Sequence, residues 1–348
     1  MSTFHMGRRL RALFWASRRF ARESRLEWLP LRHQLKRYGI PVFFKDFRAA
    51  VNIMLVDLPQ CMAYAMVAGL PIQYGLYCSV VAAVAGSLLG GSRFTVNGPT
   101  NATAVMMLSA LSLLPPEANS TRAVATLVCL TGVFLIVGAF LRVASLTRFV
   151  SRTVITGYIT GAALLIIANQ TPHILGVRVA GRPDTFVDVS MAVVVELGHF
   201  RWPVLWLGVT TLGGYMFLQS RFPRVPAAAV SLVLSSVVGV IMDGAGWAID
   251  RVQPIGVGHW PATLPAVDPA LWDLLLGPAL ALAFLAVLEN TFISKAMAHR
   301  SGHTIDPNQE MLSLGVANLA AGSLSGMAAS GSLTRSALCW SSGAVTRL

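Results

Sequence analysis

Three polar side chains recur at helical spacing in an otherwise apolar segment near residue 60. Asp57, Gln60 and Tyr64 lie three and then four residues apart, so an α-helix would place them in one polar stripe. Within a lipid bilayer, such a stripe must face protein. A glutamine amide can donate a hydrogen bond to an oxyanion, and the partly positive edge of an aromatic ring can pack beside one. Hydrogen bonding between helices is the alternative use of such residues in membranes.

Two further ionisable residues lie in apolar segments. Arg335 stands between Thr334 and Ser336, whose hydroxyls are donors, and a charge buried in lipid is costly unless it is paired or used. If Arg335 serves in a salt bridge and not at an anion site, its natural partner is Glu289, in LAFLAVLENTFISKAMA. An acid in a low dielectric takes up a proton more readily than in water, which suits a proton-coupling group. The carboxylate of Asp57 would repel an anion, so either it carries a proton during binding or it lies a turn away.

Two apolar segments are interrupted by residues that favour a helix start. In VNGPTNATAVMM the residues Gly98, Pro99, Thr100 and Asn101 break the chain after an extended stretch over 93–97, and Gly98–Pro99 suits the opening of a helix. In SGMAASGSLTRSALCW a second helix is expected to begin around Thr334 to Ser336. The N–H groups of Gly98 to Asn101 and of Leu333 to Arg335 would then point their positive dipole ends at a bound anion. The alternative is a pair of structural Gly/Pro kinks.

No arrangement of residues suggests an enzyme, a metal site or a cofactor. The close histidines His299 and His303 lack a third ligand, and VNGPTNAT lacks the GK[ST] of a phosphate-binding loop. The four cysteines lie in apolar segments without paired spacing and are expected to be packing residues.

The composition is that of an integral membrane protein. Of 348 residues, 55% are hydrophobic and 12% charged, and the mean hydropathy is +0.63. Apolar segments that approach the length of a bilayer span predict about ten helical spans or half-spans. They cover 48–68, 71–90, 123–141, 150–170, 202–220, 226–242 and 272–297, with shorter ones near 98–114, 308–322 and 332–342. The fold class expected is an all-α polytopic membrane protein.

The basic residues predict how the chain is oriented in the membrane. Residues 1–47 form a basic arm without a signal peptide's apolar core, and most other Lys and Arg fall in alternate loops. We therefore expect a multi-pass protein of the plasma (inner) membrane with a cytoplasmic N-terminus. The positive charge is interpreted as a membrane signal and not as a nucleic-acid site.

Four motifs, in order, resemble those of the SulP sulfate permeases, bacterial relatives of solute carrier family 26. They are DLPQCMAYAMVAGLPIQYGLY, GGSRFTVNGPTNATAVMM, ENTFISKAMAHRSGHTIDPNQEMLSLGVANLAAG and GSLTRSAL. The resemblance covers about residues 45–348. It implies fourteen segments in seven-plus-seven inverted repeats, a substrate-carrying core and a gate, a homodimer, and a cytoplasmic STAS domain.

The resemblance also assigns roles to residues of the site. It places Gln60 and Tyr64 in the lining of the anion pocket, Arg335 beside the anion, and Glu289 at the position of proton or sodium coupling. Sodium-coupled relatives tend to carry a hydroxyl one turn further on, where this sequence has Ile293, so protons are favoured. Asp57 departs from the small apolar residue that the family pattern leads us to expect.

The sequence stops at Leu348, near the end of the tenth segment, so the second repeat is expected to be incomplete and the STAS domain absent. Two explanations stay open: the sequence is a fragment of a longer protein, or it is a natural short transporter that a partner chain completes. The predicted domains are the arm, 1–47, and a transmembrane domain, 48–348.

The predicted function is proton-coupled secondary transport of a small anion by an elevator-like movement. Sulfate is the first candidate, and bicarbonate, chloride or a dicarboxylate are alternatives. A nucleobase carrier is disfavoured by Arg335, because a neutral substrate needs no buried cation. A fragment that does not transport is the remaining alternative.

Overall fold

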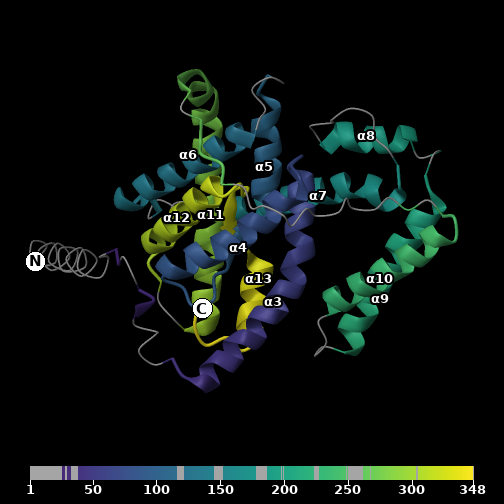
Figure 1. Cartoon of the computed structure of the whole chain (residues 1–348), viewed down its shortest axis with the longest axis horizontal. Helices are drawn as coiled ribbons and strands as arrows, with labels where there is room; N and C mark the ends of the chain where they lie inside the picture. Colours follow the sequence, from purple (N-terminus) through teal and green to yellow (C-terminus); the bar gives the residue numbers. More distant parts are fainter. Residues whose placement is uncertain are drawn as a thin grey trace, which may run out of the picture.

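The computed structural model is a helical molecule with one small strand pair at its centre (Figure 1). The structure describes residues 26–27, 30–32, 38–115, 121–144, 152–177, 186–196, 198, 200–222, 227–247, 249, 262–266, 268–302 and 305–347. Most of the predicted basic arm therefore lies outside the described residues.

The first two described helices form an antiparallel pair. Helix α3 is Ile40–Val67 and helix α4 is Ile72–Leu89. The predicted break at Gly69 and Pro71 is confirmed, because Gly69 has a φ of 71° and Pro71 is the N-cap residue of α4. The predicted apolar segment 48–68 falls almost wholly within α3, and the helix itself begins eight residues earlier with a proline in its first turn. The predicted domain boundary at 47/48 consequently falls inside α3.

The two predicted interruptions lie side by side as an antiparallel strand pair. Strand β1 is Asn97–Pro99 and strand β2 is Ala329–Gly331, with Gly98 opposite Ser330. Each strand leads directly into a half-helix: β1 into α5, Asn101–Ser112, and β2 into α13, Leu333–Ser341.

The start of α5 differs from the prediction. Pro99 ends the strand instead of opening the helix, and Thr100 is the N-cap residue, with a capping box formed by Thr103. A threonine hydroxyl satisfies an N–H group of the first turn, which proline cannot do.

Three further helices complete the core. They are α6, Thr121–Phe140; α11, Pro269–Ser301; and α12, Pro307–Ser323. Helices α11 and α12 pack on strand β2, and α6 packs on those two helices. Helix α12 packs on α4, α6 and α11. The contact between α6 and α12 is close because a Cβ on Gly132 would lie 2.8 Å from the carbonyl oxygen of Gly315. The core that positions the strands is therefore built from elements on both sides of residue 200.

The remaining helices form a separate group. They are α7, Arg152–Leu175; α8, Phe186–Glu196; α9, Trp202–Arg221; and α10, Ala227–Gly244. Helices α8, α9 and α10 lie to one side of the core, and α10 packs against α3 (Figure 1). Helix α8 was not predicted, because its 11 residues are too short for a span.

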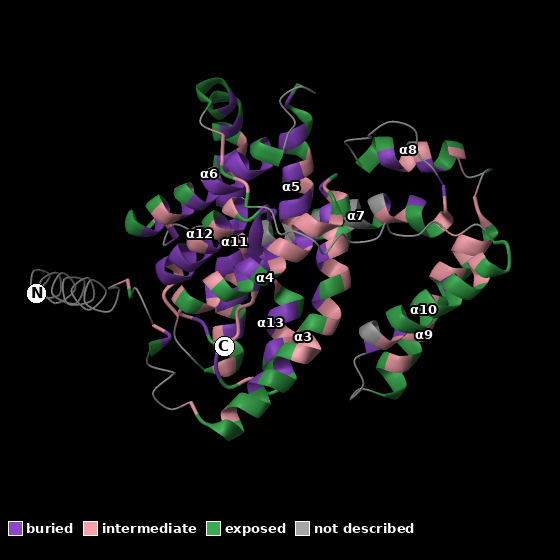
Figure 2. Cartoon of the chain, viewed as in Figure 1, coloured by how far each residue is buried: buried purple, intermediate pink, exposed green. Residues whose placement is uncertain are grey.

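In this second group, much of α8, α9 and α10 is exposed (Figure 2), and the exposed residues there include large apolar ones such as Val195 and Leu212. Helix α9 has no buried residue, and Trp206 and Phe217 are about three-fifths exposed, at 58% and 62%. Among the described residues, four helices are long and apolar enough to cross a bilayer: α3, α4, α6 and α11. Such an exposed apolar surface is stable in lipid or under further protein.

Candidate functional site

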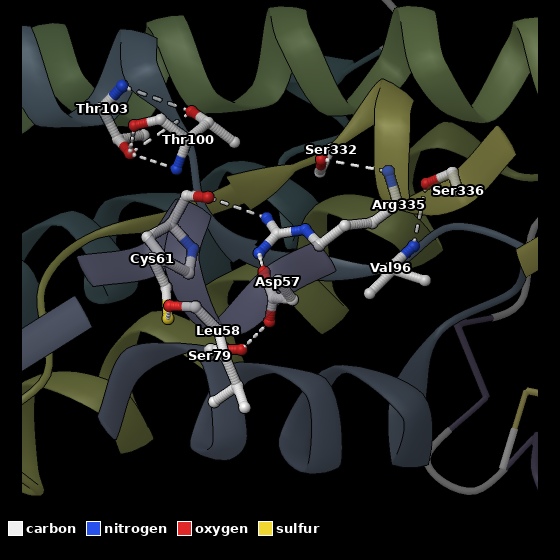
Figure 3. Close-up of polar contacts among 11 residues, drawn as sticks. Asp57, Leu58, Cys61, Ser79, Val96, Thr100, Thr103, Ser332, Arg335 and Ser336 are labelled. Carbon is white, nitrogen blue, oxygen red and sulfur yellow. Dashed lines mark hydrogen bonds and ion pairs between the residues drawn. The ribbon is translucent and has the colours of Figure 1, made fainter. Parts of the chain in front are cut away.

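The centre of the site is Arg335, in the first turn of α13. It is 0% exposed. Its Nη1 forms an ion pair with Oδ1 of Asp57 on α3, and its Nη2 donates to the carbonyl oxygen of Pro99 at 2.8 Å (Figure 3). The guanidinium therefore joins α13 to β1 and to α3, which lie far apart in the sequence.

Glu289, which the sequence suggested as the partner if Arg335 serves in a salt bridge, does not form an ion pair with it. Oε2 of Glu289 instead accepts a hydrogen bond from the hydroxyl of Thr100 at 3.0 Å. Ser330 of β2 lies close to the same acid, and its hydroxyl donates to the carbonyl oxygen of Ala286 at 3.3 Å. The acid therefore lies against the N-cap of α5 and the strand pair. Among the described residues, Asp57 is the ion-pair partner that reaches Arg335.

Of the two possibilities that the sequence left open, Asp57 does not lie a turn away from the site, because it binds Arg335 directly; that it carries a proton during binding stays a prediction. Both of its oxygens are used, because Ser79 of α4 donates to Oδ2 while Arg335 binds Oδ1 (Figure 3). The carboxylate is thus an internal counterion within the site. Ser79 was missed by sequence reasoning, since a lone serine in an apolar helix gives no signal.

The absence of a side chain at Gly98 makes room for the guanidinium. A Cβ built on Gly98 would lie 2.7 Å from Nη1 of Arg335 and 3.0 Å from its Cζ. Both contacts are with the guanidinium that also bonds Pro99. Glycine therefore allows the arginine to lie flat against β1.

The first turns of the two half-helices are capped in the same way. The hydroxyl of Thr100 accepts from the N–H of Thr103 at 3.3 Å, and the hydroxyl of Ser332 accepts from the N–H of Arg335 at 3.4 Å. None of the hydrogen bonds found among the described residues uses the N–H groups of Asn101, Ala102, Leu333 or Thr334. Three of them, Asn101, Leu333 and Thr334, are among the predicted donors. The other predicted groups are not free: the N–H of Thr100 donates to the hydroxyl of Thr103 at 3.1 Å, that of Arg335 donates to Ser332, Gly98 belongs to the strand, and Pro99 has no N–H.

The polar stripe of α3 faces the junction, by which we mean the place where β1 and the first turns of α5 and α13 meet. Tyr64 is half-buried and within electrostatic reach of Arg335, Glu289 and Asp57. Oε1 of Gln60 is buried and has no hydrogen-bond partner among the described residues. An unpaired buried amide oxygen is uncommon, and it lies one helical turn from Asp57.

The other predicted residues of α13 differ in whether their side chains are buried at the junction or exposed. Ser336 is buried, and its hydroxyl accepts from the N–H of Val96 at 3.0 Å. Leu333 and Thr334 have exposed side chains, so only their backbone groups belong to the junction.

Two half-helices that start from a buried strand pair, beside a polar stripe and a buried charge, define the class of inverted-repeat membrane transporters. The sequence matches the Sulfate permease family over residues 43–348, and the chain belongs to this family. The proteins of the family that it resembles are transporters and not enzymes.

One relative and two solved structures illustrate the similarity. The Mycobacterium tuberculosis (strain ATCC 25618 / H37Rv) protein "Probable sulfate transporter Rv1739c" is 33% identical over 333 residues, which cover 92% of this chain and 57% of that protein. The transmembrane domain of the cyanobacterial bicarbonate transporter BicA matches with a TM-score of 0.79 at 21% identity, covering 89% of this chain and 80% of that one. Murine Solute Carrier 26 family member A9, an anion transporter in the inward-facing state, matches with a TM-score of 0.81 at 23% identity, covering 92% and 56%.

The two structural matches show that the chain has the inverted-repeat fold of these transmembrane domains. The chain spans about half the length of the curated relatives it matches, 58%, 47% and 57% for three of them.

Proposed function

We propose that the protein carries a small anion across a membrane and binds it between the first turns of α5 and α13, beside Arg335. The observation that carries this proposal is a fully buried arginine at the point where two half-helices begin. Both helix N-termini bring partial positive charge and N–H donors to that point. A buried cation and two helix ends that carry partial positive charge favour an anion over a neutral substrate.

Sulfate is the first candidate for the anion. The relatives that match are named as sulfate transporters or permeases. Bicarbonate, chloride and dicarboxylates are the alternatives, because the same donors suit each of them, and one structural neighbour is a bicarbonate transporter.

Proton coupling is assigned to Glu289. Its carboxyl group contacts the N-cap residue of α5, so its charge acts directly on one of the two helix ends that would hold the anion. A proton on Glu289 would remove a negative charge from the site as the anion arrives. Ile293, one turn further along α11, offers no oxygen to a sodium ion, which favours protons.

An elevator-like movement would carry the site across the membrane. The strand pair, α5 and α13 pack with α3, α4, α11 and α12. Helices α9 and α10 pack mainly on each other, and they also contact α7 and α3 respectively. Such a division supports movement of the core against the second group. We further propose a homodimer in the plasma membrane with a cytoplasmic N-terminus.

The test is uptake of radiolabelled sulfate by proteoliposomes under an inward proton gradient. Arg335→Ala is expected to lower uptake at least tenfold, because it removes the buried cation. Arg221→Ala, at the end of α9, is the matched control and should leave uptake unchanged. Uptake by Arg335→Ala at near the wild-type rate would overturn the assignment of the site.

A further inference from the structure

The guanidinium that the anion needs is already occupied by a carboxylate of the same chain. Arg335 makes its ion pair with Asp57 and donates a second bond to Pro99. The positive charge of the site is therefore neutralised by an acid of the same chain.

Arg335 cannot follow an anion to another place. Its Nη2 is bound to the strand, and the guanidinium lies where a Cβ of Gly98 would stand. The ion pair and the bond to Pro99 use two of the five N–H groups of an arginine, and Nε has no hydrogen-bond partner among the described residues. Whichever N–H an anion beside α13 accepts, it and Asp57 must consequently share the positive charge of the same guanidinium.

The surroundings of Asp57 determine how it can give up this guanidinium. The charged group that faces it is Arg335, and the ionisable groups within electrostatic reach are Cys61 and Tyr64 on α3 and Cys78 on α4. Helix α5 and strand β1 carry no ionisable side chain, and the ionisable residue of α10 is Asp243, near its last turn. No second cation is therefore present among the described neighbours to receive the carboxylate.

An ionised carboxylate that turned away from Arg335 would be buried without a counterion. Such a group is strongly disfavoured in a protein interior, where a neutral acid is tolerated. Protonation is thus the way for Asp57 to release the guanidinium, and Ser79 can remain its hydrogen-bond neighbour in the neutral form.

We propose that Asp57 is a tethered competitor of the transported anion, so that each anion bound to Arg335 requires one proton to be taken up by Asp57. This inference rests on the proposed function, and it adds a proton to the one assigned to Glu289. In the step, a proton from water is added to the Asp57 carboxylate and its ion pair with Nη1 breaks. An oxygen of the anion then accepts that N–H, and anion and proton leave together in the reverse step.

The charges of the site support two protons for each anion. With both acids ionised, Asp57, Glu289 and Arg335 sum to one negative charge, which repels any anion. With both acids neutral, the guanidinium leaves one positive charge, which balances a monovalent anion and half-balances a divalent one. Asp57 therefore makes binding depend more steeply on pH than Glu289 alone would.

The experiment is calorimetric titration of the purified protein with sulfate, from pH 5 to pH 8, in buffers of different ionisation enthalpy, which counts protons taken up with each anion. Affinity for sulfate should fall as pH rises, by about tenfold per pH unit for each linked proton. Asp57→Asn should lower proton uptake by about one and tighten binding at pH 8 at least tenfold. Ser79→Ala should shift binding in the same direction by a smaller factor, because it destabilises the charged carboxylate while leaving the ion pair in place.

The outcomes separate this inference from the proposed function. If the wild-type protein binds no sulfate, bicarbonate, chloride or dicarboxylate at any pH, the proposed function fails and this inference fails with it. If the wild-type protein binds an anion but Asp57→Asn takes up as many protons and binds no more tightly at pH 8, this inference alone fails. Should Asp57→Asn not fold, Ser79→Ala decides, since an unchanged pH profile in that variant contradicts the competition.

Discussion

At the residue scale, the site depends on which acid meets the buried arginine. Sequence reasoning found Arg335, Glu289, Gln60, Tyr64 and Asp57 from their types and positions. It could not find the Asp57–Arg335 pair, because the two residues are 278 positions apart and the sequence suggested Glu289 as the partner. The decision depends on where α13 meets α3, and no local pattern contains that information.

The contact between Gly98 and the guanidinium can be tested by a single methyl group. Gly98→Ala is expected to displace Arg335, because the new Cβ would meet Nη1 at 2.7 Å. Sulfate affinity should fall at least tenfold. Gly213→Ala in α9, where nothing lies within 4 Å of the added Cβ, is the control and should bind as the wild type does. Unchanged affinity in Gly98→Ala would show that the guanidinium does not hold the anion.

The role of Glu289 predicts a specific loss of pH dependence. Uptake by the wild type should increase as the external pH falls, because protonation neutralises the acid beside the N-cap of α5. Glu289→Gln mimics the neutral form permanently, so the part of this stimulation that Glu289 provides should disappear. Asp273→Asn, exposed on the same helix, is the matched control. A full wild-type pH profile in Glu289→Gln would assign the coupling elsewhere.

At the element scale, the two half-helices were predictable and their exact starts were not. Small residues and Gly98–Pro99 indicated both interruptions, and both strands follow from them. The start of α5 was placed wrongly because proline suits both the first turn of a helix and the end of a strand. Pairing with β2 decides between these uses, and that partner is distant in the sequence.

Thr100 links the stability of α5 to the site. Thr100→Val keeps the shape but removes the hydroxyl that caps the N–H of Thr103 and donates to Glu289. The free energy of unfolding should fall by about 1 kcal/mol, as measured by denaturation in detergent. Thr100→Ser keeps the hydroxyl and should retain most of the stability. Equal loss in both variants would argue for methyl packing in place of the cap.

At the scale of the whole molecule, the start of α3 is bound to the segment that follows α13. We call this contact the closure of the core. Asp46, near the start of α3, accepts from the N–H of Val345 at 2.7 Å and from the hydroxyl of Thr346 at 2.5 Å. It also accepts from the N–H of Thr346 at 3.2 Å. The membrane class and fold could be predicted from composition and motifs, whereas this closure joins residues that no periodicity relates.

Removing this closure should weaken the core. Asp46→Ala leaves the N–H groups of Val345 and Thr346 without their charged acceptor, and the expected loss is about 2 kcal/mol in the free energy of unfolding. Lys45→Ala, an exposed neighbour, should change it by less than about 0.5 kcal/mol. Thermal unfolding in detergent measures both, and equal midpoints for the two variants would contradict the closure.

The opposed orientation of the two half-helices also determines the distance over which their electric field attracts an anion. Helices α5 and α13 leave the strand pair on opposite sides (Figure 1), so their dipoles largely cancel when viewed from a distance and their field decays faster than that of one helix. An anion in bulk water would be guided mainly by the formal net charge of +12, which salt screens beyond roughly 8 Å at physiological ionic strength. The rate of capture should therefore depend on ionic strength, while the strength with which the anion is held should depend on it much less.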